Sequence, residues 1–199
     1  MELQGILTLP PGAGSLVLFA HGSGSSRHSP RNRYVAAELN RSGIGTLLMD
    51  LLLPEEDRVQ ATRFDVELLA TRLAQTTTWV QQQAILLPLG YFGASIGAAA
   101  AIHAASRSPI PIQAVVSRGG RVDLAGPEAL AKLLAPTLLI IGGLDPGVIE
   151  RNESAFALLT CRKELVIVPG ATHLFEERGT LEAVARLAAQ WFQCYLGTA

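Results

Sequence analysis

Short runs of consecutive apolar residues, separated by segments with helical spacing, constrain this chain more than any other feature. A strand that is apolar on consecutive positions is buried on both faces, which is typical of the middle of a mainly parallel sheet. Alternation of such strands with helices favours right-handed crossovers and helices on both faces. We therefore predict an α/β fold with a mainly parallel sheet of about seven strands. The predicted strands cover residues 3–9, 16–20, 46–50, 87–92, 114–117, 137–142 and 164–168.

Three segments have the spacing of helices that pack on a sheet. Leu181, Val184, Ala188 and further residues to Tyr195 form one apolar stripe, and residues 64–79 form a second helix. A third, rich in alanine, follows Ser95. Residues 51–63 are the longest predicted loop. The stretch between the strands at 114–117 and 137–142 is too short for a lid domain, so we expect residues 1–199 to form a single lidless domain with an open site.

The composition indicates a globular chain without an electrostatic reason to bind nucleic acid or a membrane. Hydrophobic residues make up 49%, and 16 basic residues balance 17 acidic ones. No signal peptide and no apolar run of about 20 residues is visible, which favours the cytoplasm. Cys161 and Cys194 lack metal-ligand spacing and are expected to be reduced structural thiols in helical surroundings.

The segment Gly93-Ala94-Ser95-Ile96-Gly97 fits the G-x-S-x-G pattern of a nucleophile elbow. A predicted strand precedes it and the alanine-rich segment follows it, as the pattern requires. The serine of such an elbow sits on a sharp strand-to-helix turn with its hydroxyl above the sheet, and glycines two residues away relieve crowding. The sequence therefore predicts Ser95 as a nucleophile, with a plain glycine-rich turn as the alternative.

A second glycine-rich loop, His21-Gly22-Ser23-Gly24, follows the early strand at residues 16–20. Sites with such an elbow stabilise an oxyanion with two backbone amides, one from the residue after the nucleophile and one from the loop after an early strand. We predict the amides of Ile96 and Ser23, with Gly24 next in rank. A phosphate-binding turn is the alternative, but the spacing matches neither common phosphate-loop pattern.

The general base is chosen from only four histidines. His21 is expected to brace its loop and His28 to be exposed, and His103 lies about 12 Å along the helix from Ser95. His173 follows the last strand, at the carboxyl edge where open α/β sheets bind ligands. We predict His173 as the base.

The acid that orients the base should lie on the same edge of the sheet. Asp145 follows the strand at 137–142, one strand before His173, and Asp123 is its rival. We predict Asp145. The chain order Ser95, Asp145, His173 is that of the α/β-hydrolase fold rather than of other serine hydrolases.

These residues resemble the dienelactone hydrolase-like branch of the α/β-hydrolases. The similarity rests on His21 to Arg27, Gly93 to Gly97, Gly143-Leu144-Asp145 and Gly170-Ala171-Thr172-His173, and it spans nearly the whole chain. It implies a lidless fold and an esterase-like activity that needs no cofactor or metal. One departure matters: true dienelactone hydrolases use a cysteine nucleophile, whereas position 95 is serine, which favours a general carboxylesterase.

The expected function is cleavage of a small carboxylic ester, lactone or thioester through an acyl-enzyme. The expected partner is therefore a small-molecule substrate. An acyltransferase would use the same residues, and a non-catalytic binding module is the rival from another class. Arginines near the predicted site could favour an acidic substrate, although solvated arginines or ion pairs that brace loops are the simpler interpretation. They are Arg27, Arg31, Arg33, Arg118 and Arg121.

Overall fold

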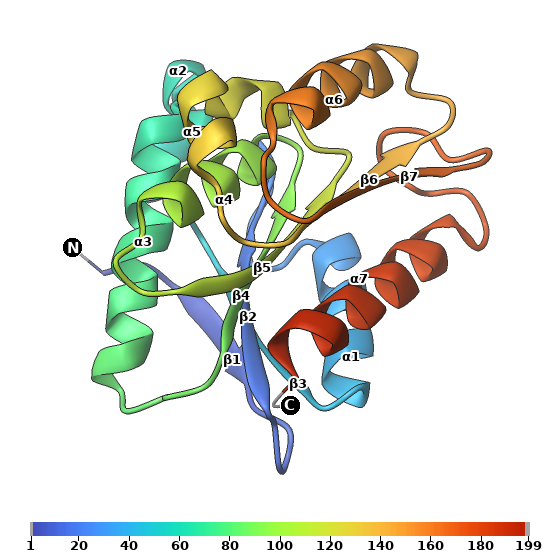
Figure 1. Ribbon diagram of the computed structural model, residues 1–199. Coiled ribbons are helices and arrows are strands. Elements are labelled where there is room, and N and C mark those ends of the chain that lie inside the picture. Colours follow the sequence, from blue (N-terminus) through green and yellow to red (C-terminus); the bar gives the residue numbers. More distant parts are fainter. Residues whose placement is uncertain (1, 198–199) are drawn as a thin grey trace.

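The computed structural model describes residues 2–197 and contains one seven-stranded sheet between two layers of helices (Figure 1). The strand order is β1-β3-β2-β4-β5-β6-β7, and only β1 is antiparallel to its neighbour. The predicted α/β fold and number of strands are confirmed. The strands are β1 (Gly5–Thr8), β2 (Ser15–Ala20), β3 (Ile44–Met49), β4 (Leu89–Ala94), β5 (Ile112–Arg118), β6 (Thr137–Gly142) and β7 (Lys163–Val168).

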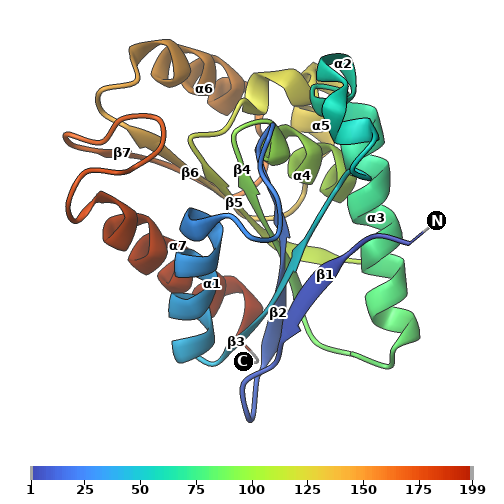
Figure 2. The same cartoon turned by 180° about the vertical axis from the view of Figure 1, so that it is seen from behind.

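Helices cover both faces of the sheet. Helices α3 to α6 pack on one face, whereas α1 and α7 pack side by side on the other (Figure 2). The long helices are α1 (Pro30–Arg41), α3 (Val66–Gln82), α4 (Ile96–Arg107), α6 (Pro146–Leu158) and α7 (Thr180–Leu196). The short ones are α2 (Gln60–Arg63) and α5 (Pro127–Lys132), with 3₁₀ turns η1 (Glu56–Arg58) and η2 (Val122–Ala125).

Burial along β2 explains why its apolar residues are consecutive. Leu16 and Leu18 belong to the core on the α3 and α4 face, and Val17 and Phe19 belong to the core on the α1 and α7 face. Neighbouring residues of a strand point to opposite faces, so a strand covered on both sides needs apolar residues at every position. The edge strand β1, by contrast, is exposed at all four positions.

Three expectations need correction or completion. Residues 51–63 are not a plain loop, because they contain η1 and α2; neither element has a buried side chain, so no apolar stripe announces it. The sequence pattern does not single out helices α1 and α6, because few of their apolar residues are buried and polar residues separate these along the helix. Cys161 lies in the turn before β7 rather than in a helix, and both cysteines are free thiols.

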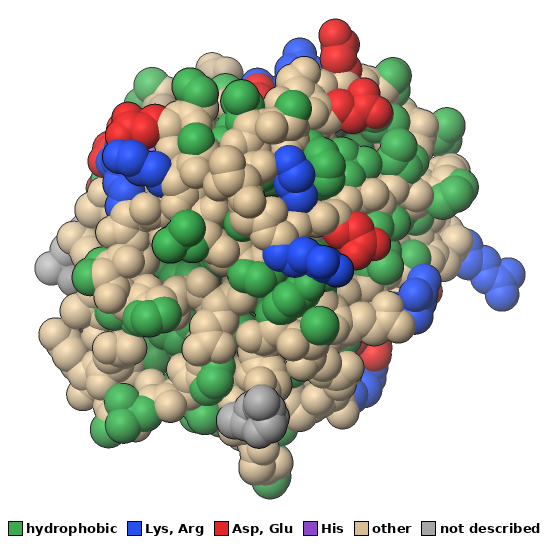
Figure 3. Space-filling view, in the orientation of Figure 1, with side chains coloured by type: hydrophobic (Ala, Val, Ile, Leu, Met, Phe, Trp, Pro, Cys, Tyr) green, Lys and Arg blue, Asp and Glu red, His purple; other side chains and the backbone are tan. Residues whose placement is uncertain are grey.

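The connection between β5 and β6 holds only η2 and α5, so no lid domain covers the sheet within residues 2–197. On the face shown in Figure 3, acidic and basic side chains lie singly or in small groups among apolar and uncharged ones. No helix in residues 2–197 has the length and apolar character that crossing a bilayer would require.

Candidate active site

Ser95 occupies a strained turn between β4 and α4. Its backbone has φ 51° and ψ −121°, a conformation that costs a non-glycine residue about 1–3 kcal/mol. Three backbone hydrogen bonds hold it there: Ser95 N–H donates to the oxygen of Arg118 (3.2 Å), and its own oxygen accepts from the amides of Ala98 (3.1 Å) and Arg121 (3.0 Å). The sequence prediction of a sharp turn at this serine is thus matched by the structure.

The two glycines of the elbow motif lie where no side chain fits. A Cβ atom on Gly93 would lie 2.4 Å from the Cα of Ala98, and one on Gly97 would lie 2.2 Å from the carbonyl oxygen of Ala20. Both neighbours are backbone atoms, so they cannot move aside cheaply. The pattern around Ser95 therefore reflects a steric requirement of the turn and of the contact between α4 and β2.

The loop after β2 lies against the elbow. A Cβ atom on Gly22 would be only 3.3 Å from the Cβ of Ser95, so the glycine allows the loop backbone to approach the serine closely. Ser23 follows as an exposed residue of the same turn, and Ile96 is the first residue of α4. The loop that contains Ser23 thus lies beside Ser95, and Ile96 follows Ser95 at the N-terminus of α4, where the helix dipole is positive.

The side chains of His21 and Asp50 hold the loop after β2 in place. The ring of His21 donates from Nδ1 to the oxygen of Gly22 (2.9 Å), and its Nε2 accepts from the amide of Leu51 (3.0 Å). Burial lowers the pKa of His21, which keeps the ring neutral. The Asp50 carboxylate accepts from the backbone amide of Arg27 (2.7 Å) and pairs with its guanidinium.

The bracing role of His21 was expected from the sequence, whereas that of Asp50 was missed. The available signal was an acidic residue directly after the buried strand β3. Because that position lies beside the loop after β2, the carboxylate of Asp50 can reach Arg27 in this loop.

His173 and Asp145 meet although they are 28 residues apart. Nδ1 of His173 lies 2.7 Å from Oδ2 of Asp145. Since a carboxylate oxygen accepts, Nδ1 carries the proton and Nε2 is the free nitrogen of the ring. Asp145 caps the start of α6 without using its side chain there, so its carboxylate is available to the imidazole.

The loop that carries His173 is fixed at both ends. The backbone of Gly142 approaches it so closely that a Cβ there would lie 2.5 Å from the oxygen of Ala171. Further along, Phe175 is buried in the core. The amide and hydroxyl of Thr172 donate to the Glu177 carboxylate (3.0 and 2.6 Å), and these bonds lower the pKa of Glu177.

The turn after β5 touches both Ser95 and His173. Arg118 and Arg121 bind the backbone of Ser95, as described above, and Gly119 lies between them. A Cβ on Gly119 would lie 3.5 Å from the Cε1 and Nδ1 atoms of His173, so this glycine, with φ +52°, lets the ring approach the elbow. The structure thus brings the three predicted residues to one rim of the sheet.

The rival residues are engaged elsewhere. Asp123 pairs with Arg121 (2.8 Å), and the structure gives it no hydrogen bond to a histidine within residues 2–197. His28 is exposed, and His103 is a largely buried residue of α4 that contacts Glu67 (3.4 Å). Among the described residues, no group of three or more His, Cys, Asp and Glu side chains is placed to hold a metal ion.

The fold together with this rim defines an α/β-hydrolase. A dienelactone hydrolase from Anabaena variabilis superposes with a TM-score of 0.94 and is 54% identical in sequence, covering 98% of this chain and 93% of that one. The chain therefore belongs to the dienelactone hydrolase-like family, as the sequence motifs indicated. An α/β serine hydrolase homologue from Coxiella burnetii shares the fold at 18% identity, with a TM-score of 0.79 over 94% of this chain and 90% of that one.

Two similar proteins carry the name of a transferase rather than of a hydrolase. A protein from two strains of Mycobacterium tuberculosis, called "Putative phosphoribosyl transferase", is 57% identical over 194 residues, which is 96% of this chain. This chain spans only 44% of the length of that relative. No protein-family model matches the chain.

Proposed function

We propose that this chain is a serine hydrolase that cleaves carboxylic ester bonds of small molecules through an acyl-enzyme, with lactones and thioesters as related substrates. The observation that carries the proposal is the arrangement of Ser95, Asp145 and His173 at one rim of the sheet. Ser95 is held on a strained elbow, and the Asp145–His173 pair lies across Gly119 from it. The Anabaena relative, a dienelactone hydrolase by name, supports hydrolase chemistry.

In the proposed mechanism, Nε2 of His173 removes the proton from the Ser95 hydroxyl while Asp145 stabilises the imidazolium. Oγ of Ser95 then forms a bond to the substrate carbonyl carbon. The amides of Ile96 and Ser23 bind the oxygen that gains negative charge. His173 returns the proton to the leaving alcohol, and water repeats the sequence to release the acid.

The partial exposure of His173 and Asp145 fits the proposed catalytic cycle. The side chain of His173 is 38% exposed and that of Asp145 is 20% exposed, so substrate and water can reach the imidazole while the carboxylate stays shielded. The hydrogen bond between Asp145 and His173 already fixes the orientation of the imidazole ring. An open rim of this kind suits small substrates rather than chains that need a covering lid.

The name of the longer mycobacterial relative describes the transfer of a phosphoribosyl group. A serine–histidine–aspartate rim offers acyl transfer, and no residue of this rim suggests pentose phosphate chemistry. We therefore assign the proposed hydrolase role to the part of the relative that this chain matches.

The test is labelling by a fluorophosphonate probe combined with hydrolysis of short-chain aryl esters, thioesters, lactones and amides. We expect the probe to label Ser95, and Ser95→Ala to lose labelling and on the order of 10⁴-fold in turnover. Ser154→Ala removes an exposed serine of α6 and serves as the matched control. Full esterase activity in Ser95→Ala would disprove the proposal, and an unlabelled wild type without activity on any ester would favour a binding module.

A further inference from the structure

Asn152 is a buried polar side chain of α6 that reaches the turn after β5. Its exposed fraction is 0%, and its Nδ2 atom donates to two carbonyl oxygens, those of Gly120 and Val148, each at 2.8 Å. Carbonyl oxygens only accept, so the nitrogen rather than the oxygen of the amide must face them. The Oδ1 atom is buried and finds no hydrogen-bond donor within residues 2–197. The contacts of this side chain are therefore those of its two donors.

The turn after β5 holds the nucleophile through its backbone. The carbonyl of Arg118 accepts from the amide of Ser95 (3.2 Å), and the amide of Arg121 donates to the carbonyl of Ser95 (3.0 Å). Gly120 lies between these two bonds in the chain, and the structure shows Asn152 as the donor to its carbonyl oxygen. The strained elbow thus depends on a turn that Asn152 holds.

Packing and hydrogen bonding restrain Gly120 together. A Cβ atom on Gly120 would lie 2.0 Å from Oγ of Ser117 and 2.6 Å from the Cβ of Ala98, so its backbone lies tightly against β5 and α4. The amide of Asn152 binds it from α6. Packing therefore limits movement of the turn toward α4, and the hydrogen bond limits movement away from α6.

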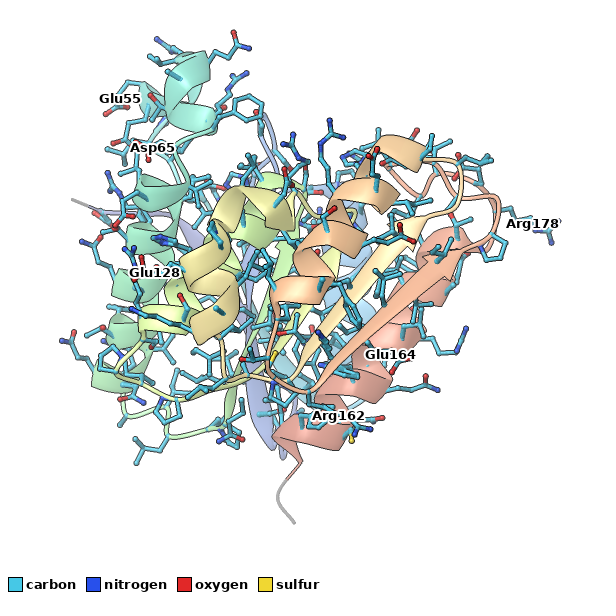
Figure 4. All side chains as sticks on the ribbon, turned by 45° about the horizontal axis from the view of Figure 1, so that its top comes forward. Glu55, Asp65, Glu128, Arg162, Glu164 and Arg178 are labelled. Atoms are coloured by element: carbon cyan, nitrogen blue, oxygen red, sulfur yellow. The ribbon has the colours of Figure 1, made fainter. Side chains whose placement is uncertain are left out.

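Helix α6 also follows the acid of the proposed site. Asp145 directly precedes the helix, and its carbonyl oxygen accepts from the amides of Val148 (3.1 Å) and Ile149 (3.0 Å). Asn152 lies one helical turn further on and binds the oxygen of Val148. Helix α6 lies beside α5 in Figure 4 and contacts η2, which follows the turn after β5. Asn152 thus connects the helix that follows the acid to the turn that holds the nucleophile.

We propose that Asn152 is a positioning residue, which sets the distance between Ser95 and the imidazole of His173. This inference rests on the proposed function and adds a residue to it. Asn152 is fully buried, so it acts through Gly120, whose neighbour Gly119 approaches the imidazole. Proton transfer needs the hydroxyl and the ring within hydrogen-bond reach, and a misplacement of about 1 Å costs on the order of 10²-fold in rate. Loss of the amide should therefore slow the attack of the serine rather than weaken substrate binding.

The first test measures how fast a fluorophosphonate probe labels the serine in Asn152→Leu, which removes both donors but keeps a side chain of similar size. We expect the rate constant of labelling and kcat on an aryl ester to fall about 10–100-fold, with KM changed less than about threefold. A rate constant is a property of the folded molecules. A variant that only unfolds more readily would therefore give less labelled protein at the wild-type rate constant. That result in Asn152→Leu would overturn the proposal.

Asn40→Leu is the matched control. Nδ2 of Asn40 also donates to a backbone carbonyl, that of Ile44 (2.9 Å), and to Oγ1 of Thr46 (3.0 Å). These two partners lie at the start of β3, at the edge of the sheet opposite to the elbow. Asn40→Leu should lower the free energy of unfolding but keep the labelling rate constant and kcat. If both variants lost activity equally, any missing amide would slow the enzyme, and Asn152 would have no positioning role.

Asn152→Ser separates the two hydrogen bonds of the amide. A serine in a helix binds the carbonyl four residues earlier, as Ser154 of α6 does with Glu150 (3.0 Å). The variant should therefore keep a bond to Val148 and lose the bond to Gly120, and the labelling rate constant should fall as in Asn152→Leu. It also replaces the leucine variant if that variant does not fold. A wild-type rate constant in Asn152→Ser would reject the role of the contact with the turn.

Amide hydrogen exchange tests the turn without any reaction. The amides of Ser95 and Arg121 report on the elbow, and the amide of Val115, which donates to Pro136 (2.9 Å) near the start of β5, is the reference. We expect Asn152→Leu to speed exchange at the first two at least about tenfold relative to the reference, as the loss of one hydrogen bond implies. Equal changes at all three amides, or none, would overturn the proposal even if esters are cleaved. A wild type that is neither labelled nor active on esters defeats the proposed function, whereas the exchange rates still decide whether Asn152 holds the turn.

Discussion

The carboxylate of Asp145 accepts a hydrogen bond from His173, whereas the carboxylate of Asp123 pairs with Arg121. Only the first can orient the imidazole for proton transfer. We predict that Asp145→Asn lowers kcat on an aryl ester by on the order of 10²–10⁴-fold, because the amide favours the wrong tautomer of the ring. Asp123→Asn removes a partly exposed ion pair and should change kcat little. Comparable losses in both variants would contradict the assignment of the acid.

Gly97, the last residue of the elbow motif, gives a second prediction. A methyl group on Gly97 would lie 2.2 Å from the oxygen of Ala20 and 2.5 Å from that of His21, so α4 would have to move away from β2. Gly97→Ala should lower the free energy of unfolding by about 1–3 kcal/mol and reduce esterase activity. Urea denaturation and kcat measure the two effects.

Gly14 provides the control for this substitution. It is exposed, its φ is not positive, and a Cβ there meets nothing within 4 Å. Gly14→Ala should therefore leave the free energy of unfolding within about 0.5 kcal/mol of the wild type. Equal stability of the two variants would show that the contact between α4 and β2 is not as tight as described.

His21 couples stability to pH. Burial holds its pKa below the ordinary 6.5, so the unfolded chain binds this proton more readily than the folded one. The resulting stability is complete above pH 6.5 and is lost as the pH falls through the lower folded-state pKa. We predict that the free energy of unfolding falls between pH 7 and pH 5, measured by urea denaturation at each pH.

His21→Asn should reduce this pH dependence, whereas His28→Gln, which changes an exposed ring, should keep it. Some dependence will remain in His21→Asn, because burial also lowers the pKa of His103. If the free energy of unfolding of His21→Asn depended on pH as steeply as that of the wild type, the buried ring would not control the stability in acid.

The hydroxyls of Thr77 and Tyr91 lie 2.6 Å apart in the core between α3 and β4. Thr77 itself donates to the oxygen of Leu73, so Tyr91 is the donor to Thr77, and burial raises the pKa of Tyr91 to about 12. Thr77→Val leaves the Tyr91 hydroxyl unpaired and should cost about 1–3 kcal/mol. Thr78→Val, an exposed threonine with the same kind of backbone bond, is the control and should cost much less.

A double-mutant cycle tests this reading of the pair. Tyr91→Phe should cost less than Thr77→Val, because Thr77 keeps its bond to Leu73. The double variant should recover part of the loss, since no buried hydroxyl is then left unpaired. Additive losses in the cycle would contradict the direct bond.

The sequence predicted those parts of the fold in which burial dictates residue type. Strands β2 to β6 were predicted because two-sided burial leaves consecutive apolar residues, whereas the edge strands β1 and β7 have apolar runs although they are largely exposed or half-buried. Errors at their ends come from residues that also suit turns: β3 begins at Ile44 rather than Thr46, since Gly45 interrupts the pattern. Helix α1 was not singled out because its buried residues Val35, Ala36 and Leu39 are separated by polar ones, although Ser29 and Pro30 were usable start signals.

The candidate site was predictable to the extent that it depends on chain order and strand ends. Ser95, Asp145 and His173 could be placed at one rim because the carboxyl ends of parallel strands converge. The bracing role of Asp50 could not be predicted in this way. It depends on whether the charged side chain finds a partner on another element, which only the packed structure settles.

Every side chain of α4 from Ile96 through Ala104 is buried, whereas η1 and α2 have no buried side chain. The amide protons of this central helix can therefore exchange with water only when the sheet itself opens, while peripheral turns open and close at little cost. Ser95 is thus attached to a helix that is buried over its first nine residues, and we expect this helix to be among the last segments to open. Thermal fluctuations at the surface will thus leave the geometry of the elbow intact.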